Sequence, residues 1–538
     1  MDDTCPANST DPAIALPGAR WSDLRWLLLL LALAAGLRGW QVARAELASR
    51  DSVAYIRQAW RFEHEPWSEV IRTSPHHPVY AVLVYLMAKP VRAVVDNLPR
   101  AMQLAAQLAS SLASVLLVVP MYYLGRELFD RRVGFWAALL VQVLPSTGRM
   151  LPDGLSEGPF LLLAATALLF AALGLRTGGV RWFVLTGLTT GLAYLTRTEG
   201  LLVTAVTGMV LLGLQRSVRW RQPWATTGRN AAALAAGCAV VAVPFMLLIG
   251  GVSLKASYRY MIDPEGWKLP PRVELPAVAA PLPLALWNYG PDVLPRDRYG
   301  WAAWAVLQVL DDSFFHLGLP LAVLGLWLFR RGFADAPGRW LVVVLGLVLL
   351  PLLYKLGQSN GYLGERHAVL LVLGGVYFAV AAVGAVAAWL AARQPRLSAP
   401  AAGLVLMGAW TAVCVPKAVA PLHANRAGFR EAGEWLAQHS EPGDPVVDPM
   451  AWTSYHAGRL FVEGRSDVAR SSPPVSYVVL ERSNSTHSHL YYLIGPAEEL
   501  AKRGEVCYRQ SVRRGKAKAE IVIYRVPHPG GVRTARGE

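Results

Sequence analysis

The residues directly after the first apolar segment could take part in proton transfer. They read Arg50-Asp51-Ser-Val-Ala-Tyr55. A carboxylate one turn beyond a helix end could accept a proton from the hydroxyl or amine of an acceptor. An aspartate that only caps the next helix would stand in the same place. The motif by itself favours neither interpretation, so Asp51 is a candidate catalytic residue and Tyr55 a candidate substrate-binding residue.

A second acidic pair, Asp153 and Glu157, lies in Leu-Pro-Asp-Gly-Leu-Ser-Glu-Gly. A spacing of four residues predicts that both carboxylates lie on one face of a helix. Acidic groups at a membrane surface cost free energy unless they serve a substrate, a cation or a distant arginine. Favourable placement at a helix start is the structural alternative. We favour function, with Asp153 as a candidate catalytic acid and Glu157 as a candidate substrate-binding residue.

Two histidines precede a short apolar segment in Ser74-Pro-His76-His77-Pro-Val-Tyr80. Adjacent histidines project in different directions and seldom bind a metal by themselves. A phosphate at the N-terminus of the following helix suits them better. A turn fixed by its prolines is the alternative. We predict that His76, His77 and Tyr80 are substrate-binding residues.

Charged residues also stand at two later turns. Arg197 and Glu199 can form an internal ion pair that positions their turn, a role that we rank above catalysis. Arg366 could bind a lipid-linked phosphate, because a guanidinium forms bidentate hydrogen bonds with phosphate. It could equally anchor a helix at the membrane interface. All three residues are candidate substrate-binding residues.

The elements that must position these residues are membrane-spanning helices. The 538 residues are 54% hydrophobic and 17% charged, whereas about 25% are charged in a typical soluble domain. The apolar residues form blocks of the length that a helix needs to cross a bilayer. We therefore predict an all-α polytopic membrane protein with a small C-terminal extracytoplasmic α/β domain. The predicted spans, eleven in all, are 24–42, 101–124, 133–151, 156–174, 182–197, 199–214, 230–250, 313–329, 340–356, 367–391 and 399–417.

Basic residues in alternate short loops predict the orientation. The loops 125–132, 175–182, 215–229, 330–339 and 392–398 carry 14 Lys and Arg, whereas 145–157, 196–199 and 355–366 carry four. Loops rich in Lys and Arg face the cytoplasm. The N-terminus is then cytoplasmic and, after an odd number of spans, the C-terminus is periplasmic, in a bacterial-type inner membrane.

The same pattern predicts the division of the chain. Residues 1–23 form a cytoplasmic tail, and 24–417 a transmembrane domain with long outer loops at 43–100 and 251–312. Residues 418–538 form a periplasmic domain, in which an amphipathic helix is followed by the strand candidates PVVDP, SYVVLE and EIVIYRV. The stretches HPVYAVLVYLMA and WAAWAVLQVL are too short to span the membrane, so we predict that they form helices at the membrane interface.

Two classes of function are disfavoured. The net charge of +15 comes from arginines in short loops between apolar blocks, which argues against nucleic acid. The 4 cysteines give neither a metal-binding spacing nor a disulfide framework.

Several features follow one another in a set order along the chain. The outer loop with Asp51 and Tyr55 is followed by the His/Pro turn, then by Tyr123–Phe129 (YLGRELF), the second acidic pair, Gly191–Leu201 (GLAYLTRTEGL) and an outer C-terminal domain. This order resembles that of the GT-C superfamily of polyprenyl-phosphate-dependent glycosyltransferases. The protein O-mannosyltransferase and lipid A aminoarabinose transferase group is the most similar. The likeness is best over residues 45–205.

The resemblance implies helices packed around a cavity that opens to the periplasm and to lipid, where a sugar passes with inversion from a polyprenyl phosphate to an acceptor. Asp51 matches the family's first-loop aspartate, expected to act as general base or to orient the acceptor. Asp153 matches the second loop acid, which Glu157 would assist. His76 stands where aminoarabinose-type members have a lysine that binds the donor phosphate. The acceptor, a lipid, a glycan or a protein, is left open.

Two further points depend on this resemblance. Positive charge for the leaving phosphate would come from His76 and Arg366, with Lys255 or Arg259. The first loop has Asp51-Ser52 in place of the family's frequent Asp-Glu pair, so the cofactor is open, with a divalent metal ion as the candidate.

Two alternatives belong to other classes. A secondary transporter or lipid flippase would carry charges near mid-span, whereas here they gather at the outer ends of the apolar blocks. A non-catalytic lipid- or sugar-binding protein of the same fold would be expected to lack the first-loop acid, and Asp51 is present.

Overall fold

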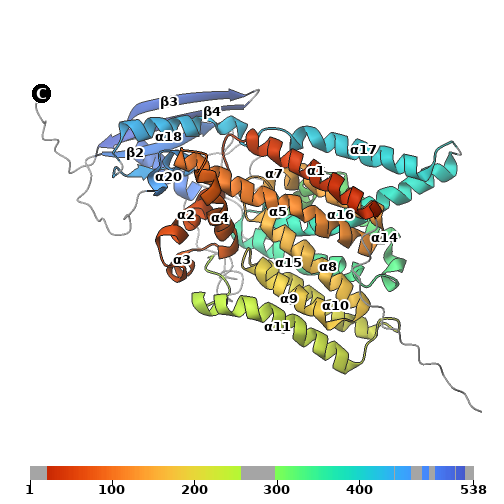
Figure 1. The fold of residues 1–538 in the computed structure, drawn as a ribbon. Helices are drawn as coiled ribbons and strands as arrows, with labels where there is room; N and C mark the ends of the chain where they lie inside the picture. Colours follow the sequence, from red (N-terminus) through yellow and green to blue (C-terminus); the bar gives the residue numbers. More distant parts are fainter. Residues whose placement is uncertain are drawn as a thin grey trace, which may run out of the picture.

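The chain folds into a bundle of long helices with a small sheet at one end (Figure 1). The computed structural model describes residues 21–255, 297–394, 396–441, 443–461, 475–483, 491–514 and 517–527. Most of the predicted cytoplasmic tail, and residues 256–296 of the second outer loop with Arg259, lie outside the described residues.

A helix occupies each of the eleven predicted spans, but these helices differ in length. Seven described helices are long and apolar enough to cross a membrane, or eight if one bent pair counts as a single span. The prediction of eleven spans is therefore not confirmed, because α6, α9 and α10 have 13, 15 and 14 residues. The helices are α1 (Trp21–Ala43), α5 (Leu98–Leu128), α6 (Arg131–Val143), α8 (Glu157–Thr177), α9 (Val180–Tyr194), α10 (Gly200–Gly213), α11 (Trp224–Ile249), α14 (Gly318–Leu328), α15 (Arg339–Asn360), α16 (Glu365–Arg393) and α17 (Ala399–Ala418).

One predicted span is interrupted, and another is bent away from the helix that precedes it. The segment predicted at 133–151 breaks at Leu144, whose ψ of 132° is not helical, and a short helix α7 (Pro145–Met150) follows. The break follows from Pro145, since a proline disfavours helical backbone at the residue before it. In the second case α13 (Asp297–Ser313), which contains the predicted interfacial stretch WAAWAVLQVL, meets α14 at an angle of 94°.

The first outer loop is helical and packs on the bundle. It contains α2 (Arg50–His64), α3 (Trp67–Thr73) and α4 (Pro78–Arg92), the last being the predicted interfacial helix. Tyr55 of α2 and Tyr80 of α4 are buried in one apolar cluster with Ala101 and Ala105 of α5. This packing fixes the start of α2, and therefore Asp51, against the end of the bundle.

The C-terminal segment forms a four-stranded sheet in the order β1-β2-β4-β3, with β1 parallel to β2 and the other pairs antiparallel. The predicted amphipathic helix is α18 (Gly428–His439), and the three predicted strands are present. β3 was not predicted, because its residues after Tyr508 are mostly polar or charged. The strands and further helices are β1 (Val446–Val447), α19 (Trp452–His456), β2 (Val475–Ser483), α20 (Tyr491–Ala501), β3 (Glu505–Arg514) and β4 (Ala517–Pro527).

The basic loops gather at the end of the bundle that is far from the sheet (Figure 1). Arg176 pairs with Glu127 at 2.9 Å, and Arg219 pairs with Asp335. Arg339 Nε donates to the Leu128 carbonyl at 2.8 Å. These contacts join four of the five loops that were predicted to face the same side.

The C-terminal segment is attached to the opposite end, on the first outer loop. Trp452 Nε1 donates to the carbonyl of Ala48 at 3.0 Å, and Arg50 Nε donates to that of Pro449 at 3.0 Å. Leu47 is fully buried among Phe429 and other core residues of the C-terminal segment. The outer loop and the C-terminal segment therefore form one face of the molecule.

Candidate active site

Asp51 and Glu157 are joined by an arginine from a distant helix. The Asp51 carboxylate, at the start of α2, accepts a hydrogen bond from Arg366 Nη1. Arg366, at the start of α16, also donates Nε to Glu157 Oε1 at 2.9 Å. Glu157 is the first residue of α8 and is fully buried. Three segments that are far apart in the sequence thus meet through one guanidinium.

A second arginine extends this row of charges. Arg197, in the turn between α9 and α10, donates Nη1 to Glu157 Oε1 at 2.6 Å and Nη2 to Glu199 Oε1 at 2.7 Å. The predicted pair between Arg197 and Glu199 is therefore present. Glu157 Oε2 is buried without a hydrogen-bond partner among the described residues. Both arginines contact Oε1, so the second oxygen keeps its capacity to accept a hydrogen bond.

His76 lies beside Asp51, at the turn before α4. Its ring contacts that of Tyr55, with the ring centroids 4.5 Å apart. The Tyr55 hydroxyl forms a hydrogen bond with Ser156 Oγ at 2.9 Å. His76 Nδ1 is buried and has no hydrogen-bond partner within the part of the chain that the structure describes. An imidazole nitrogen without a hydrogen-bond partner can bind a polar ligand.

The electrostatics of the site set the charge of each group. Burial opposes the ionisation of Asp51, but Arg366 outweighs it and lowers the Asp51 pKa to about 2. Burial, with Lys255 adding to it, lowers the pKa of His76 to about 3. Burial and the nearby Arg197 lower the Lys255 pKa to about 8. Near neutral pH, Asp51 is therefore an anion, His76 is neutral and Lys255 is mostly a cation.

His76 and His77 should make the folded protein sensitive to acid. Burial, followed by Lys255, lowers the pKa of His77 to about 4, so both imidazoles take up protons more readily in the unfolded chain. Stability conferred by neutral histidines is lost as the pH falls below about 6.5. We expect the unfolding temperature in detergent to fall between pH 7 and pH 5, and His76→Gln to reduce this fall. The exposed His64 provides the control, His64→Gln, and an equal reduction there would contradict the assignment.

His77 and Tyr80 make internal contacts. His77 Nε2 is 3.2 Å from Thr198 Oγ1, and its ring packs against Tyr194 and Phe245. The Tyr80 hydroxyl donates to the carbonyl of Ala106 at 2.9 Å. In the structure these two residues hold the start of α4 against the turn at 196–200 and against α5.

Asp153 faces the C-terminal segment. Its carboxylate oxygens lie 2.9 and 3.0 Å from His423 Nε2, and its backbone carbonyl accepts from Ser49 N at 3.2 Å. The predicted common helix face with Glu157 is wrong, because α8 begins only at Glu157 and Gly154 has a φ of +69°. The Asp153 carboxylate thus contacts His423, and Asp153 is not among the residues that line a cavity with Asp51 and His76.

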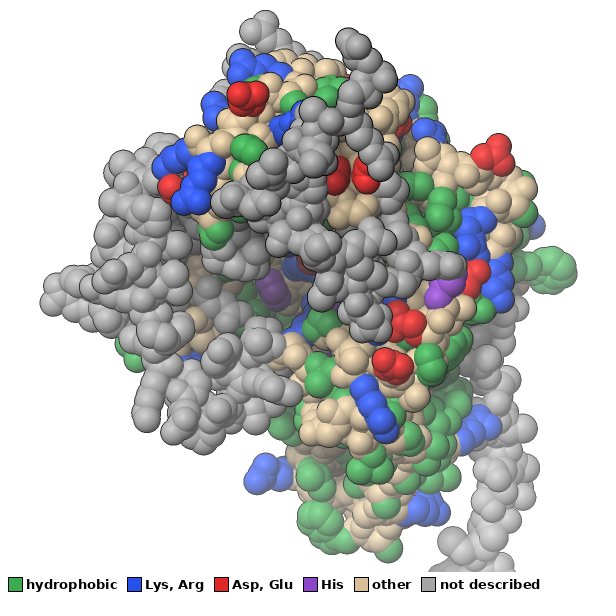
Figure 2. Space-filling view, turned by 90° about the vertical axis from the view of Figure 1, so that its left-hand side faces the viewer, with side chains coloured by type: hydrophobic (Ala, Val, Ile, Leu, Met, Phe, Trp, Pro, Cys, Tyr) green, Lys and Arg blue, Asp and Glu red, His purple; other side chains and the backbone are tan. Residues whose placement is uncertain are grey.

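A cavity of about 500 Å³ lies beside Asp51 and His76. Figure 2, which views the molecule from the end that carries α2 and the sheet, shows a His side chain and basic side chains within a hollow. One wall comes from α2 and the other from the C-terminal segment around α19. No local pattern in the sequence predicts this second wall, because its residues approach α2 only through the tertiary fold. Residues on the two walls include Arg57, Ser454, Tyr455 and Arg459.

Acidic and histidine ligands for a metal ion come together elsewhere among the described residues. Asp311, Asp312 and His316 place one ligand atom each within 4.8 Å of one another. His316 Nδ1 is 2.6 Å from Asp311 Oδ2, at the junction of α13 and α14. Around Asp51, in contrast, Arg366 and Lys255 supply positive charge. That arrangement fits an anionic group better than a divalent cation.

Comparisons with known proteins agree with this fold. Residues 78–246 match the family described as dolichyl-phosphate-mannose-protein mannosyltransferase. ArnT from Cupriavidus metallidurans, in the apo state, is similar over 94% of this chain and 98% of its own, with a TM-score of 0.55 and 14% identity. The Archaeoglobus fulgidus oligosaccharyltransferase is similar over 82% of this chain, with a TM-score of 0.53 and 14% identity. The match spans 64% of that archaeal protein. Among curated proteins no sequence matches.

The fold is that of a polytopic membrane protein, and it is similar to the GT-C fold of ArnT and of the archaeal oligosaccharyltransferase. The resemblance to GT-C glycosyltransferases that the sequence indicates is confirmed by the match over residues 78–246 and by the similarity of the fold to that of ArnT.

Proposed function

We propose that the protein is a membrane glycosyltransferase that moves a sugar, with inversion, from a polyprenyl phosphate to an acceptor at the periplasmic face. The observation that carries the proposal is the pairing of Asp51 with Arg366 beside the cavity that His76 also lines. A carboxylate, a guanidinium and a half-buried imidazole from three segments supply a base and ligands for a phosphate.

Arg366 links donor binding to the basicity of Asp51. While Arg366 contacts the carboxylate, the Asp51 pKa of about 2 makes it a poor base. A donor phosphate competes for the guanidinium, which raises the pKa of Asp51 toward its ordinary value. Asp51 then takes the proton of the acceptor hydroxyl or amine as that group attacks the anomeric carbon. The bond from this carbon to the phosphate oxygen breaks, and the electron pair leaves with the polyprenyl phosphate.

The polyprenyl carrier is supported by two of the similar structures. ArnT from Cupriavidus metallidurans has been solved bound to undecaprenyl phosphate, and it matches this chain with a TM-score of 0.51 and 15% identity. The archaeal oligosaccharyltransferase AglB has been solved with a dolichol-phosphate and an inhibitory peptide. A lipid-borne donor also explains why the site lies at the end of membrane-spanning helices.

Lys255 has a role in this proposal as a ligand of the donor phosphate. Lys255 is half-buried, and its ammonium lies within electrostatic range of Asp51 and Arg366. We expect Lys255→Gln to raise the KM for the donor by about 10- to 100-fold, the cost of losing one charged hydrogen bond, with a smaller change in kcat. The matched control is Lys89→Gln, since Lys89 is exposed on α4. An unchanged KM in Lys255→Gln would remove this residue from the donor site.

The proposed orientation places the N-terminus in the cytoplasm and residues 418–538 in the periplasm of an inner membrane. The four connected basic loops support it, because such loops stay cytoplasmic. The predicted domain boundaries, with a transmembrane part over 24–417, follow from the same orientation.

Cysteine labelling in whole cells tests this orientation. In a background without Cys5 and Cys507, a cysteine at Glu499 should react with a membrane-impermeant maleimide once the outer membrane is permeable. Glu499 is exposed on α20. The paired variant Arg219→Cys, in an exposed basic loop, should react only after lysis. The opposite pattern would invert the topology.

The proposed activity is tested by mass spectrometry of envelope lipids and glycans from cells with and without the gene. A glycan or glycolipid that lacks one sugar in the deletion strain, and regains it with the wild-type gene but not with Asp51→Asn, is the expected result. Identical envelopes in the three strains would contradict a glycosyltransferase.

A further inference from the structure

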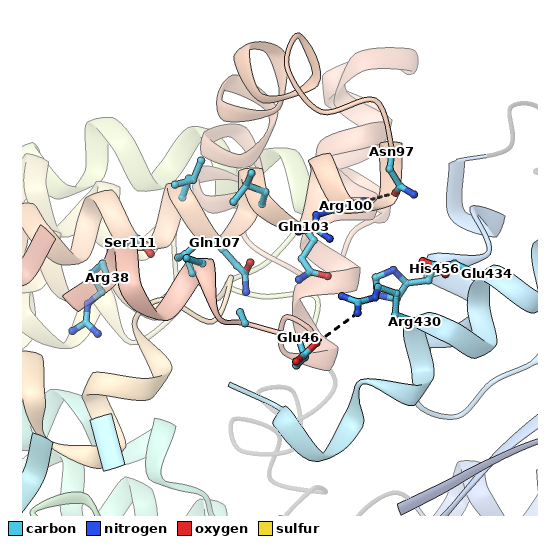
Figure 3. A pocket seen from close by; sticks show the side chains of 16 residues that line it. Arg38, Glu46, Asn97, Arg100, Gln103, Gln107, Ser111, Arg430, Glu434 and His456 are labelled. Carbon is cyan, nitrogen blue, oxygen red and sulfur yellow. Dashed lines mark hydrogen bonds and ion pairs between the residues drawn. The ribbon is translucent and has the colours of Figure 1, made fainter. Parts of the chain in front are cut away.

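A second cavity, of about 430 Å³, lies on the other side of the first outer loop (Figure 3). It is bounded by the end of α1, the first half of α5 and the helices α18 and α19. Figure 3 shows Gln103 of α5 and Arg430 of α18 projecting toward the space between them, with Glu46 close by. Its polar lining consists largely of Gln103, Gln107, Ser111, Arg430, Glu434 and His456.

Three atoms in these side chains lack a hydrogen-bond partner. Gln107 Nε2, Ser111 Oγ and His456 Nε2 are buried and, among the residues that the structure describes, contact no donor or acceptor. Each such atom costs about 1–3 kcal/mol if it stays unsatisfied. Three of them in the walls of one cavity indicate a ligand with several hydrogen-bonding groups.

The charges of the cavity are balanced apart from Arg38. Arg100 and Arg430 are matched by Glu46 and Glu434, and Arg430 lies 3.7 Å from Glu46. Arg38, at the deep end, is also a cation, but it is fully engaged. It donates to Ser114 Oγ at 2.9 Å, to Gln142 Oε1 at 2.6 Å and to the Gly148 carbonyl. The cavity therefore has no free surplus of positive charge for a phosphate, unlike the site around Asp51. Hydroxyl groups, which both donate and accept, suit it better.

The cavity is continuous with a leucine row on α5. Leu104 and Leu108 belong to its lining. Leu108, Leu112 and Leu116, spaced by one helical turn, are 36%, 48% and 44% exposed. On a helix that is long and apolar enough to span, such a row lies against lipid chains. A ligand with its hydroxyl-rich part in the cavity can extend an alkyl chain along this row.

The two cavities share a wall. Tyr455 of α19 lines the cavity of Asp51, and the next residue, His456, lines this one. Glu46 and Arg50, four residues apart, likewise line one cavity each. We infer that the second cavity binds the uncharged carbohydrate head group of a membrane-anchored glycolipid, and that this glycolipid is the acceptor. The assignment as acceptor rests on the proposed transferase function, whereas the binding of the head group does not.

Photolabelling in phosphatidylcholine nanodiscs tests the inference. The probe is dodecyl maltoside with a diazirine in its alkyl chain, and the comparison probe has the same chain with a phosphocholine head. We expect the maltoside to label α5 within 103–116 and the segment 452–456 several-fold more strongly than the comparison probe. Equal labelling by the two probes would overturn the inference.

Variants and competitors sharpen this test. Gln107→Leu combined with Ser111→Ala should reduce labelling by about tenfold, since two hydrogen bonds are lost. Ser110→Ala is the matched control, because the Ser110 hydroxyl donates to the Ala106 carbonyl within its own helix. Unchanged labelling in the double variant would overturn the site. Free maltose at the probe concentration should not compete, and displacement would assign the cavity to a soluble saccharide instead.

The Asp51→Asn protein separates this inference from the proposed function. Labelling that persists in Asp51→Asn while transfer is lost is the result expected when both are correct. A wild-type protein that transfers sugar but is not labelled in the cavity would disprove the inference alone. A wild-type protein that is labelled but transfers nothing would leave the binding site standing and remove the acceptor role.

Discussion

Asp51→Asn is expected to lower the rate of sugar transfer by about 10²- to 10⁴-fold, the usual contribution of a general base. Asparagine has nearly the same shape and can still accept a hydrogen bond from Arg366, so the fold and donor binding should persist. The rate is measured as release of polyprenyl phosphate by purified protein in liposomes, and folding is checked by the unfolding temperature.

Asp96→Asn is the matched control for this loss. Asp96 is an exposed aspartate of the same outer loop, and its amide variant should transfer at the wild-type rate. Full activity in Asp51→Asn would remove Asp51 from the mechanism. A loss of activity with an equal loss in Asp96→Asn would point to a general effect of charge on the outer face.

Glu157→Ala is expected to destabilise the protein by about 3–5 kcal/mol, the cost of removing one partner from a buried ion pair. Glu157 is fully buried and accepts from both Arg197 and Arg366, and its loss leaves two guanidinium groups without their shared acceptor. We expect a marked fall of the unfolding temperature in detergent, and a smaller fall for Glu157→Gln, which keeps an acceptor oxygen.

Glu65→Gln is the control for this second prediction. Its carboxylate pairs with Arg61 at the surface and is 37% exposed, so its removal should cost less than about 1 kcal/mol. If Glu157→Ala were no more destabilising than Glu65→Gln, the row of charges from Asp51 to Glu199 would not be a structural element of the site.

Local patterns in the sequence predicted most of the helices. Runs of apolar residues mark the spans because a helix in a membrane needs about twenty of them. The amphipathic period of α18 and the short apolar strands of the C-terminal segment are equally local. The sequence contains Pro145, but the apolar residues on both sides of it predict one continuous span. The break at Leu144 was therefore not predicted.

The site was predictable only in part. Asp51, His76, Glu157 and Arg366 could be selected because each stands at the outer end of an apolar block. Their partners could not be predicted, since the contact between Arg366 and Asp51 joins residues 315 positions apart. The orientation of the Asp153 side chain could not be predicted either, because it depends on a contact with His423 of the C-terminal segment.

The location of a bound polyprenyl phosphate tests most directly the claim that the donor binds at Asp51 and Arg366. Purified protein in nanodiscs is photolabelled with undecaprenyl phosphate that carries a diazirine near the phosphate, and the labelled peptides are identified by mass spectrometry. We predict labelling of residues 74–80, 252–255 and 362–366, reduced in Lys255→Gln and unchanged in Lys89→Gln. Label spread evenly over the lipid-facing helices, and equal in both variants, would contradict a donor site at Asp51 and Arg366.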